Sequence, residues 1–320
     1  MSGNSWNGKG AQHRGRERMT TGSDDTNATG ARRGRIAFQG ELGANSHAAC
    51  LQARPEYEPL PCPTFEDVFA AVERGEAELA IIPVENNLAG RVADIHHLLP
   101  ESRLHIVGEH FLPIHHHLMA PPGASIEGLR EVHSHVHALG QCRKLIRELR
   151  LSARVAADTA GAAREVAERG EPTVAAIAPK LAAEIHGLEI LRENVEDEDY
   201  NVTRFLVMAR EPLDIPPDDG PVITSFIFQV RNVPAALYKA LGGFATNGVN
   251  MTRLESHQIG GNLLATQFHA DIEGHPEDRP VRLALEELKF FSNEVRILGT
   301  YPASPMRAKV MERAGRERVD

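Results

Sequence analysis

Thr203 and Arg204 place a hydroxyl beside a guanidinium within residues 201–205. An acidic run precedes this stretch and the apolar run 205–208 follows it, which predicts a junction between a loop and a strand. A guanidinium binds carboxylates through charge-assisted hydrogen bonds, and a hydroxyl can donate to a departing oxygen. The pair therefore fits a site that holds a carboxylate and helps a hydroxide leave. Taken alone, a Thr-Arg pair that simply begins a strand is the alternative.

Two loops upstream carry polar side chains where a predicted strand ends. Residues 39–46 include two glycines and Ser46, and free N–H groups at the following helix start favour an anion. The glycines of this loop do not have the spacing of a dinucleotide-binding fingerprint. A simple tight turn is the alternative to an anion-binding loop. Residues 83–90 include Asn86, whose amide can bind a substrate hydroxyl or carboxylate, although a structural Asx turn explains it equally well.

Two further segments have chemistry-bearing residues. Asp158 is predicted to cap a helix and to leave Thr159 facing a crevice, with capping alone as the alternative. His133, His135 and His137 alternate as they would on one strand face, and imidazole suits Zn²⁺. A helix start near His137 interrupts that face and no carboxylate accompanies the set, so we predict no metal.

Composition limits the class of protein. A chain of 320 residues predicts two or more compact units, and 42% hydrophobic with 25% charged residues is typical of a soluble globular protein. The net charge of -9 argues against nucleic-acid binding. No apolar run reaches the roughly 18 residues of a membrane span, and no secretory signal is apparent, so we expect a cytoplasmic protein without membrane contact. Three cysteines without a CxxC pair predict reduced, buried thiols.

The elements that must position these residues alternate between strand and helix. Residues 1–34 are predicted to be a disordered tail, with Met19 as a possible alternative start. From residue 35 the pattern predicts an α/β fold with a largely parallel sheet, which binds ligands at the carboxyl ends of its strands. Strands are predicted at 35–39, 79–84, 104–107, 114–119, 154–156 and 173–177, and helices at 45–53, 65–74 (with Thr64 as N-cap), 91–99, 138–149, 159–168 and 179–186.

A second unit follows a proline-rich, acidic linker at 211–221. Strands are predicted at 224–230, 249–257, 262–271 and 294–299, and helices at 234–246 and 276–291. This βαββαβ order is typical of a ferredoxin-like fold. Residues 302–320 are predicted to be a charged tail.

Taken in order, these segments resemble the prephenate dehydratase family, in its monofunctional form with a C-terminal ACT regulatory domain. The family motif Gly-Pro-x-Gly-Thr-Phe-Ser corresponds to residues 40–46, where Ala44 and Asn45 replace the Thr and Phe and Ser46 is kept. Glu-Asn-Ser corresponds to residues 85–87, where Asn86 is kept and the serine is lost. Ser-His-Pro-Gln-Ala-Leu-x-Gln-Cys corresponds to residues 134–142, where Gln141 is kept and the Pro and first Gln are lost. Thr-Arg-Phe is intact at residues 203–205.

The resemblance implies a two-lobed, periplasmic-binding-protein-like catalytic domain at 35–210, with the site between the lobes. Lobe 1 is expected at about 35–113 and 201–210, lobe 2 at about 114–200, and the ACT domain at 222–301. The implied enzyme is a lyase that converts prephenate to phenylpyruvate, water and CO₂ in phenylalanine biosynthesis, without cofactor or metal.

The resemblance also implies roles for individual residues. Thr203 would be the proton donor or relay, and Arg204 would stabilise a substrate carboxylate or tune Thr203. The residues expected to bind substrate are Ser46, Glu85, Asn86, Gly90, Ser134, Gln141 and Thr159. Phenylalanine is the expected effector, and the chain is expected to form a homodimer or homotetramer. The effector would be bound by Ala235, Leu237, Asn250, Leu254, Glu255 and Ser256.

Two family motifs of the ACT domain are altered: Gly-Ala-Leu is Ala-Ala-Leu at 235–237, and Glu-Ser-Arg-Pro is Glu-Ser-His-Gln at 255–258. Three alternatives to the implied function stay open. They are an arogenate dehydratase, a noncatalytic amino-acid sensor, and a zinc hydrolase.

Overall fold

The computed structural model describes residues 34–309, except residues 218, 232, 260 and 261. The tail predicted at 1–34 lies outside the described residues apart from Gly34, as does the part of the C-terminal tail beyond residue 309. Among the described helices, none is long and apolar enough to cross a membrane.

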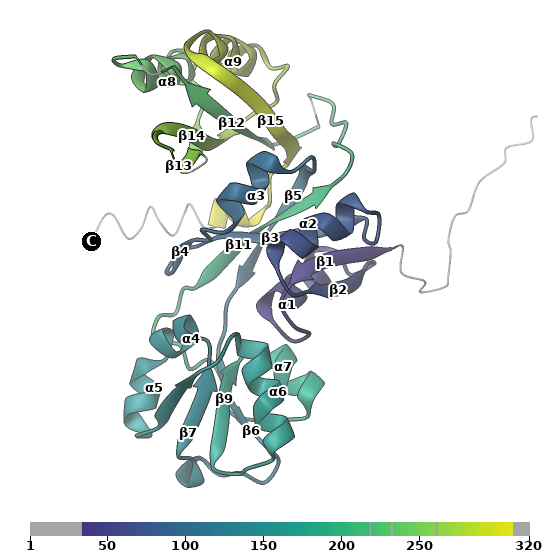
Figure 1. Cartoon of the computed structure of the whole chain (residues 1–320), viewed down its shortest axis with the longest axis vertical. Helices are drawn as coiled ribbons and strands as arrows, with labels where there is room; N and C mark the ends of the chain where they lie inside the picture. The colour runs from purple at the N-terminus through teal and green to yellow at the C-terminus, as the bar shows by residue number, and fades with distance from the viewer. Residues whose placement is uncertain (1–33, 218, 232, 260–261, 310–320) are drawn as a thin grey trace, which may run out of the picture. The chain divides into compact units, whose positions relative to one another are not determined.

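The first sheet has the order β2-β1-β3-β11-β5, with the short β4 paired to β3 (Figure 1). Its strands are β1 (Arg35–Gln39), β2 (Glu58–Cys62), β3 (Leu79–Asn86), β4 (Gly90–Arg91), β5 (His105–Pro113) and β11 (Val202–Ala209). Helix α1 (Asn45–Ala53) packs in one core on this sheet, while α2 (Phe65–Glu73) and α3 (Ile95–Glu101) pack in another. Thr64 caps α2 as predicted, because its hydroxyl accepts from the Asp67 backbone N–H.

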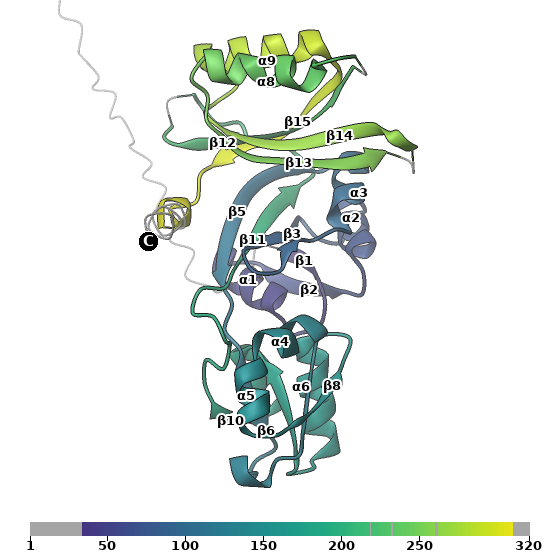
Figure 2. The same cartoon turned by 90° about the vertical axis from the view of Figure 1, so that its left-hand side faces the viewer.

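The second sheet has the order β10-β6-β9-β7-β8. Its strands are β6 (His117–Ala120), β7 (Glu131–Ser134), β8 (Ser152–Val155), β9 (Val174–Ala178) and β10 (Glu189–Arg192). Helices α4 (Val136–Gln141) and α5 (Arg143–Glu148) contribute to one core, and α6 (Thr159–Arg169) and α7 (Lys180–His186) to another (Figures 1 and 2). A 3₁₀ turn spans Ile126–Gly128.

The α/β prediction is confirmed, but the expectation of a largely parallel sheet is only partly right. Among the described strands, parallel pairing is limited to β1 with β2 and β3, and to β7 with β8 and β9. Strand β11 runs antiparallel between β3 and β5, and β6 runs antiparallel to β9 and β10. The chain passes from the first sheet to the second after β5 and returns before β11, so the crossing segments meet at residues 114–116 and 195–201.

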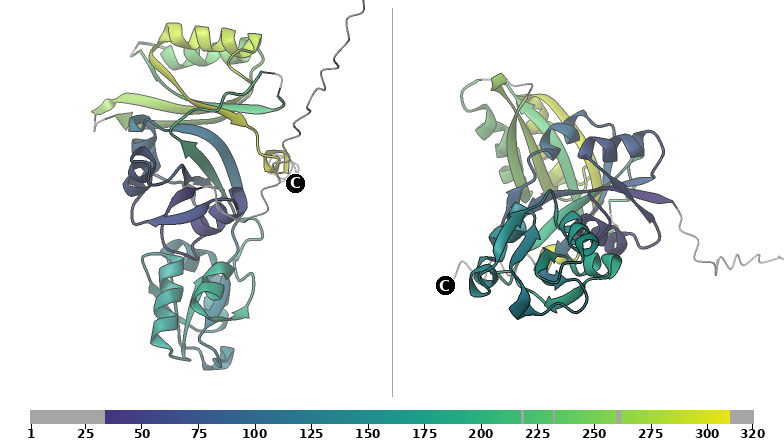
Figure 3. Two further views of the ribbon diagram at one scale, coloured as in Figure 1. Left: turned by 90° about the vertical axis from the view of Figure 1, so that its right-hand side faces the viewer. Right: turned by 60° about the horizontal axis from the view of Figure 1, so that its bottom comes forward.

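The third sheet has the order β13-β14-β12-β15 and is antiparallel throughout. Its elements are β12 (Val222–Val230), α8 (Ala236–Thr246), β13 (Met251–Ile259), β14 (Asn262–Glu273), α9 (Arg279–Phe291) and β15 (Ser292–Pro302). The predicted βαββαβ order is confirmed. Helices α8 and α9 lie side by side over one face of this sheet (Figure 3, left). Ile223, Ile227 and Tyr301 belong instead to the core that contains α2 and α3 of the first sheet.

Candidate active site

The hydroxyl of Thr203 is held by the side chain of Asn86. Thr203 on β11 pairs with Asn86 on β3, and Asn86 Nδ2 donates to Thr203 Oγ1 over 3.0 Å. Asn86 Oδ1 accepts from the backbone N–H groups of Leu88 and Ala89 at 3.0 and 2.7 Å. Only the carbonyl oxygen of an amide can accept, so these two bonds fix the amide orientation. Thr203 therefore receives a hydrogen bond, and its own proton is directed toward another acceptor.

A chain of side chains extends from Asn86 to the second sheet. Asn86 Nδ2 also donates to Asn201 Oδ1 (2.6 Å), and Asn201 Nδ2 donates to Gln141 Oε1 (3.0 Å). His116 Nε2 lies 2.9 Å from the same Gln141 oxygen. Because that oxygen can only accept, we assign the hydrogen of the neutral imidazole to Nε2. The chain thus joins β3, both crossing segments and α4.

His116 is buried, which favours its uncharged form. Its side chain is 3% exposed, and its Nδ1 has no hydrogen-bond partner in the described part of the chain. Burial lowers the pKa of His116, partly offset by the hydrogen bond to Gln141 and the charge of Glu196. With its carbonyl occupied, Gln141 offers a ligand its NH₂ group. A neutral, fixed donor of this kind suits the recognition of a carboxylate or keto oxygen.

The other residues expected to bind substrate are placed differently. Ser134 is fully buried, and its hydroxyl donates to the Ile177 carbonyl at 2.5 Å, which ties β7 to β9. Ser46 is buried in the first turn of α1, and Thr159 is half-buried at the first residue of α6. Asp158 caps α6 as predicted, through the Gly161 N–H. Gly90 is exposed in β4 with φ +83°.

Arg204 points to the opposite face of β11 from Thr203. Successive strand residues alternate between faces, and the guanidinium is 3% exposed on the face away from α1. It donates to Asp271 (2.7 Å), Glu109 (2.9 Å), Tyr301 (3.0 Å) and Glu85 (3.1 Å). Arg204 and Glu85 are therefore paired with each other, and both reach the third sheet, Glu85 through Arg253. Thr203 lies on the other face of β11, paired with Leu112 of the core that contains α1.

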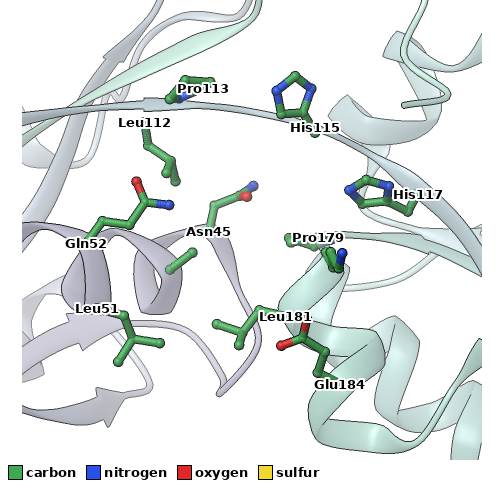
Figure 4. Close-up of a pocket in the computed structure, with 12 residues that line it drawn as sticks. Asn45, Leu51, Gln52, Leu112, Pro113, His115, His117, Pro179, Leu181 and Glu184 are labelled. Carbon is green, nitrogen blue, oxygen red and sulfur yellow. The ribbon is translucent and has the colours of Figure 1, made fainter. Parts of the chain in front are cut away.

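A cavity of about 420 Å³ lies on the α1 side of the first sheet (Figure 4). Leu112, which is paired with Thr203 across β5 and β11, forms part of its wall. The remaining wall comes from α1 (Asn45, Ala48, Leu51, Gln52), the crossing residues (Pro113, His115, His117) and the start of α7 (Pro179, Lys180, Leu181, Glu184). The volume is in the range of about 300–1,000 Å³ typical of small-molecule sites. The lining of the cavity is mainly apolar, with titratable side chains at the crossing (His115, His117) and on α7 (Lys180, Glu184).

Comparison with known proteins places this arrangement in a family. A family model described as prephenate dehydratase matches residues 36–213, more than half of the chain. The chain belongs to the prephenate dehydratase family. The bifunctional N-acyl-homoserine lactone acylase/prephenate dehydratase of Komagataeibacter europaeus is 54% identical over 274 residues, which cover 86% of this chain and 98% of that protein.

Two other members extend the comparison. Arogenate dehydratase/prephenate dehydratase 2 of Arabidopsis thaliana is 39% identical over 277 residues, covering 84% of this chain and 72% of the relative. The crystal structure of the Arthrobacter aurescens prephenate dehydratase in complex with L-Phe superposes with a TM-score of 0.77 at 29% identity. That match covers 89% of this chain and 99% of the other, so the likeness includes the third sheet.

The two sheets of the prephenate dehydratase domain touch at the loop before α1. Gly43 has φ +95°, and a Cβ there would lie 2.9 Å from Ala182 Cα of α7. Glu41 in the same loop pairs with Arg164 of α6 at 2.9 Å, and this hydrogen bond lowers the pKa of Glu41. The second glycine of the family motif therefore allows close contact between the two parts of the domain.

The residues expected to bind an effector are spread along the third sheet. Ala235 caps α8 with φ +60°, at the position where the family motif has glycine. Asn250 follows the far end of this 11-residue helix, about 16 Å away along its axis. Leu237 packs in the core under α8 and α9, and Leu254 and Ser256 are exposed on β13. Glu255 pairs with Arg253. One chain does not bring Ala235 next to Asn250.

Two residues of the site were missed by sequence analysis. His116 was assigned no role from the sequence, yet its Nε2 lies 2.9 Å from Gln141 Oε1. Asn201 was noted only as the start of the 201–205 stretch. Its position directly before β11, two residues from Thr203, was the signal that could have identified it.

Proposed function

We propose that this chain catalyses the decarboxylating dehydration of prephenate to phenylpyruvate, water and CO₂ in phenylalanine biosynthesis. Membership of the prephenate dehydratase family supports the reaction. The observation that carries the assignment of residues is the bond from Asn86 Nδ2 to Thr203 Oγ1, which leaves the Thr203 proton for the substrate.

The proposed step breaks two bonds of the substrate. The electrons of the bond to the ring carboxylate move into the ring as CO₂ leaves, and the C4 hydroxyl departs with its bonding pair. Thr203 gives its proton to that hydroxyl, so water is released, and the resulting alkoxide regains a proton from water. The Asn86 N–H stabilises negative charge on Oγ1, which offsets the weak acidity of a threonine. Aromatisation of the ring supplies the driving force.

Two substitutions test the role of Thr203. Thr203→Val keeps the shape of the side chain and removes its hydroxyl, so kcat for phenylpyruvate formation is expected to fall by roughly 10²–10⁴. Thr203→Ser keeps the hydroxyl and is expected to restore most of this loss. If Thr203→Val turns over prephenate at the wild-type rate, the proposed donor is wrong.

The substrate preference is proposed as prephenate, with arogenate as the alternative. These molecules differ by a keto group against an amine, and the Arabidopsis relative is named for both activities. Steady-state turnover of both substrates by the same preparation decides between them. Binding of phenylalanine with turnover of neither substrate would favour an amino-acid sensor instead.

We also propose that phenylalanine regulates the enzyme through the ferredoxin-like unit, acting as an ACT domain in a homodimer or homotetramer. The Arthrobacter structure, which holds L-Phe and covers the third sheet, supports this proposal. Ala235 and Asn250 lie at opposite ends of α8, which favours a pocket shared between two copies. Calorimetry with phenylalanine, together with light scattering at several protein concentrations, tests both parts.

Hydrolysis of N-acyl homoserine lactones is a second candidate activity. It is favoured by the 54% identity to the Komagataeibacter acylase/dehydratase and by the largely apolar cavity, whose wall includes Leu112, the β5 partner of Thr203. One water would cleave the amide to give a fatty acid and homoserine lactone. Asn45→Phe restores the aromatic residue of the family motif and fills the cavity, so it is expected to reduce acyl release from an N-acyl homoserine lactone while prephenate turnover persists. Wild-type protein that releases no fatty acid excludes this activity.

A further inference from the structure

A buried charged cluster joins the strand that carries Thr203 to the third sheet. We propose that Arg204 is a positioning residue that couples the Thr203 hydroxyl to the ferredoxin-like unit through Asp271 and Tyr301. The inference rests on the proposed function, because it says how the proposed catalytic site at Thr203 is connected to the regulatory unit. It replaces the expected contact of Arg204 with substrate.

The contacts of Arg204 cross from the first sheet to the third. Its Nη1 donates to Asp271 Oδ2 on β14 at 2.7 Å, and its Nη2 donates to Tyr301 Oη on β15 at 3.0 Å. Ser225 on β12 donates to Asp271 at 2.5 Å and lies 2.8 Å from Tyr301 Oη. One guanidinium therefore contacts a network that spans three of the four strands of the third sheet.

The first sheet holds the same guanidinium from its own side. Glu109 on β5 accepts from Arg204 Nε at 2.9 Å, and Glu85 on β3 accepts from Nη1 at 3.1 Å. These are the strands that flank β11. Glu109 also binds Arg307, which follows β15. The planar fork of arginine can satisfy all these acceptors at once, which a lysine could not.

Burial makes this cluster sensitive to the loss of any member. Arg204, Glu109, Asp271 and Tyr301 are each at most 3% exposed at the side chain or residue level. Burial would raise the pKa of Asp271, but Arg204 and His269 hold it well below its usual range. Removing one partner of a buried charge leaves the other uncompensated and is strongly unfavourable. The third sheet therefore cannot shift against β11 without carrying Arg204 with it.

A movement of Arg204 reaches Thr203 directly. The two residues are adjacent on β11, and the pairing of β11 with β3 shifts register between Arg204 and Phe205, beside Pro83. A ligand of the third sheet that favours one placement of β14 and β15 would thereby favour one placement of the Thr203 hydroxyl, through differential affinity for the two states.

Two conservative variants test the coupling. Tyr301→Phe removes one hydroxyl from the cluster, and Asp271→Asn removes one charge while keeping an acceptor. Both are expected to lower kcat by roughly 2- to 30-fold, the range of coupling effects in other proteins, with a much smaller change in KM. Both are also expected to weaken the response of the rate to phenylalanine.

Arg296→Ala is the matched control. Arg296 lies on β15 and donates to the carbonyls of Ser102, Leu99 and Pro100. It therefore joins the third sheet to the end of α3, which packs on the first sheet, and not to β11. It is expected to lower the midpoint of urea unfolding while keeping kcat and the phenylalanine response. Loss of kcat in all three variants alike would show a merely structural interface and overturn the coupling.

Hydrogen exchange gives a readout that does not depend on activity. Amides of β11 are expected to exchange faster in folded Tyr301→Phe and Asp271→Asn than in the wild type, and at the wild-type rate in Arg296→Ala. Unchanged β11 exchange in the first two variants overturns the inference. If wild-type protein forms no phenylpyruvate while the exchange pattern is as expected, the proposed function fails and the physical coupling stands.

Discussion

The Asn86 amide determines whether Thr203 can donate a proton. Asn86→Asp keeps an oxygen for the Leu88 and Ala89 N–H groups but replaces the NH₂ donor with an acceptor. The carboxylate would accept the Thr203 proton and bring negative charge next to Oγ1. We expect kcat to fall by about 10²–10³, as when one preorganised donor is removed from an active site. The rate of phenylpyruvate formation at saturating prephenate measures this fall in kcat.

Asn87→Asp is the control for this change. Asn87 is the next residue, and its Oδ1 accepts from Val202 N at 2.7 Å, a bond that a carboxylate keeps. Its Nδ2 donates to the Tyr200 carbonyl at 2.8 Å, and the variant loses this bond without touching the Thr203 hydroxyl. The same chemical change one position away is therefore expected to have a much smaller effect on kcat. Equal losses in the two variants would point to general damage of the loop rather than to the Thr203 hydrogen bond.

For single residues, the sequence was a better guide to which side chains form the site than to the direction in which each side chain points. Thr203, Asn86 and Gln141 come together as one hydrogen-bonded group, as their loops suggested. The orientation of Arg204 followed from strand alternation, which the sequence already contained. Its partners could not be predicted, because Asp271 and Tyr301 are 67 and 97 residues away along the chain.

The loop before α1 depends on two glycines with different surroundings. Gly43 and Gly40 have φ values of +95° and +115°, which are unfavourable for any other residue. A Cβ at Gly43 would meet the Ala182 backbone at 2.9 Å, whereas a Cβ at Gly40 has its nearest neighbour at 3.7 Å. Gly43→Ala is therefore expected to force the two sheets of the catalytic domain apart and raise KM for prephenate.

Gly40→Ala separates this effect from backbone strain. Both variants are expected to lose stability, since each places a Cβ at positive φ, at a cost of roughly 1 kcal/mol or more. Only Gly43→Ala is expected to raise KM. A similar rise in both would mean that loop strain, rather than contact with α7, controls substrate binding.

The sequence predicted the helices and strands that have a clear local pattern, such as a capping residue or regular apolar spacing. It did not predict those that lack such a pattern. The helix at 65–73 has both a Thr64 cap and regular apolar spacing. Strand β2 contains Pro59 and Pro61, which argue against a strand, and it lies at the edge of the described sheet, where it pairs with β1. The pairing of β11 between β3 and β5 is a long-range contact that no local pattern shows.

At the scale of the whole molecule, the sequence did not predict the contact between the third sheet and the first sheet. The linker at 211–221 predicted a separate second unit, and the third sheet does have its own core under α8 and α9. Its other face shares a core with the first sheet through Ile223, Ile227, Leu298 and Tyr301. Along β12 the side chains alternate between the two cores, because Ile227 belongs to this one while Phe226 and Phe228 lie under α8 and α9. Both faces of the sheet are therefore buried, but the surface that covers the second face is distant in sequence.

Fully or partly buried histidines in the described part of the chain should make its stability depend on pH. The pKa values of His110, His116, His117, His135 and His257 are all lowered, with burial as the main cause. In the unfolded chain these groups titrate near 6.5, so below that pH the unfolded state binds more protons than the folded state. The neutral histidines therefore contribute to the free energy of unfolding in full above about pH 6.5, and this contribution is lost as the pH falls toward their pKa values in the folded state.

We expect the midpoint of urea unfolding to be higher at pH 7.5 than at pH 5.5. Carboxyl groups with lowered pKa, such as Glu196 and Glu41, add their own loss only at lower pH, so they do not account for this window. His110→Asn is the matched variant, because burial and the nearby Arg54 charge lower the pKa of His110 and its Nε2 has no partner in the described part of the chain. The variant should show a smaller difference between the two midpoints, and equal midpoints in the wild type would contradict the prediction.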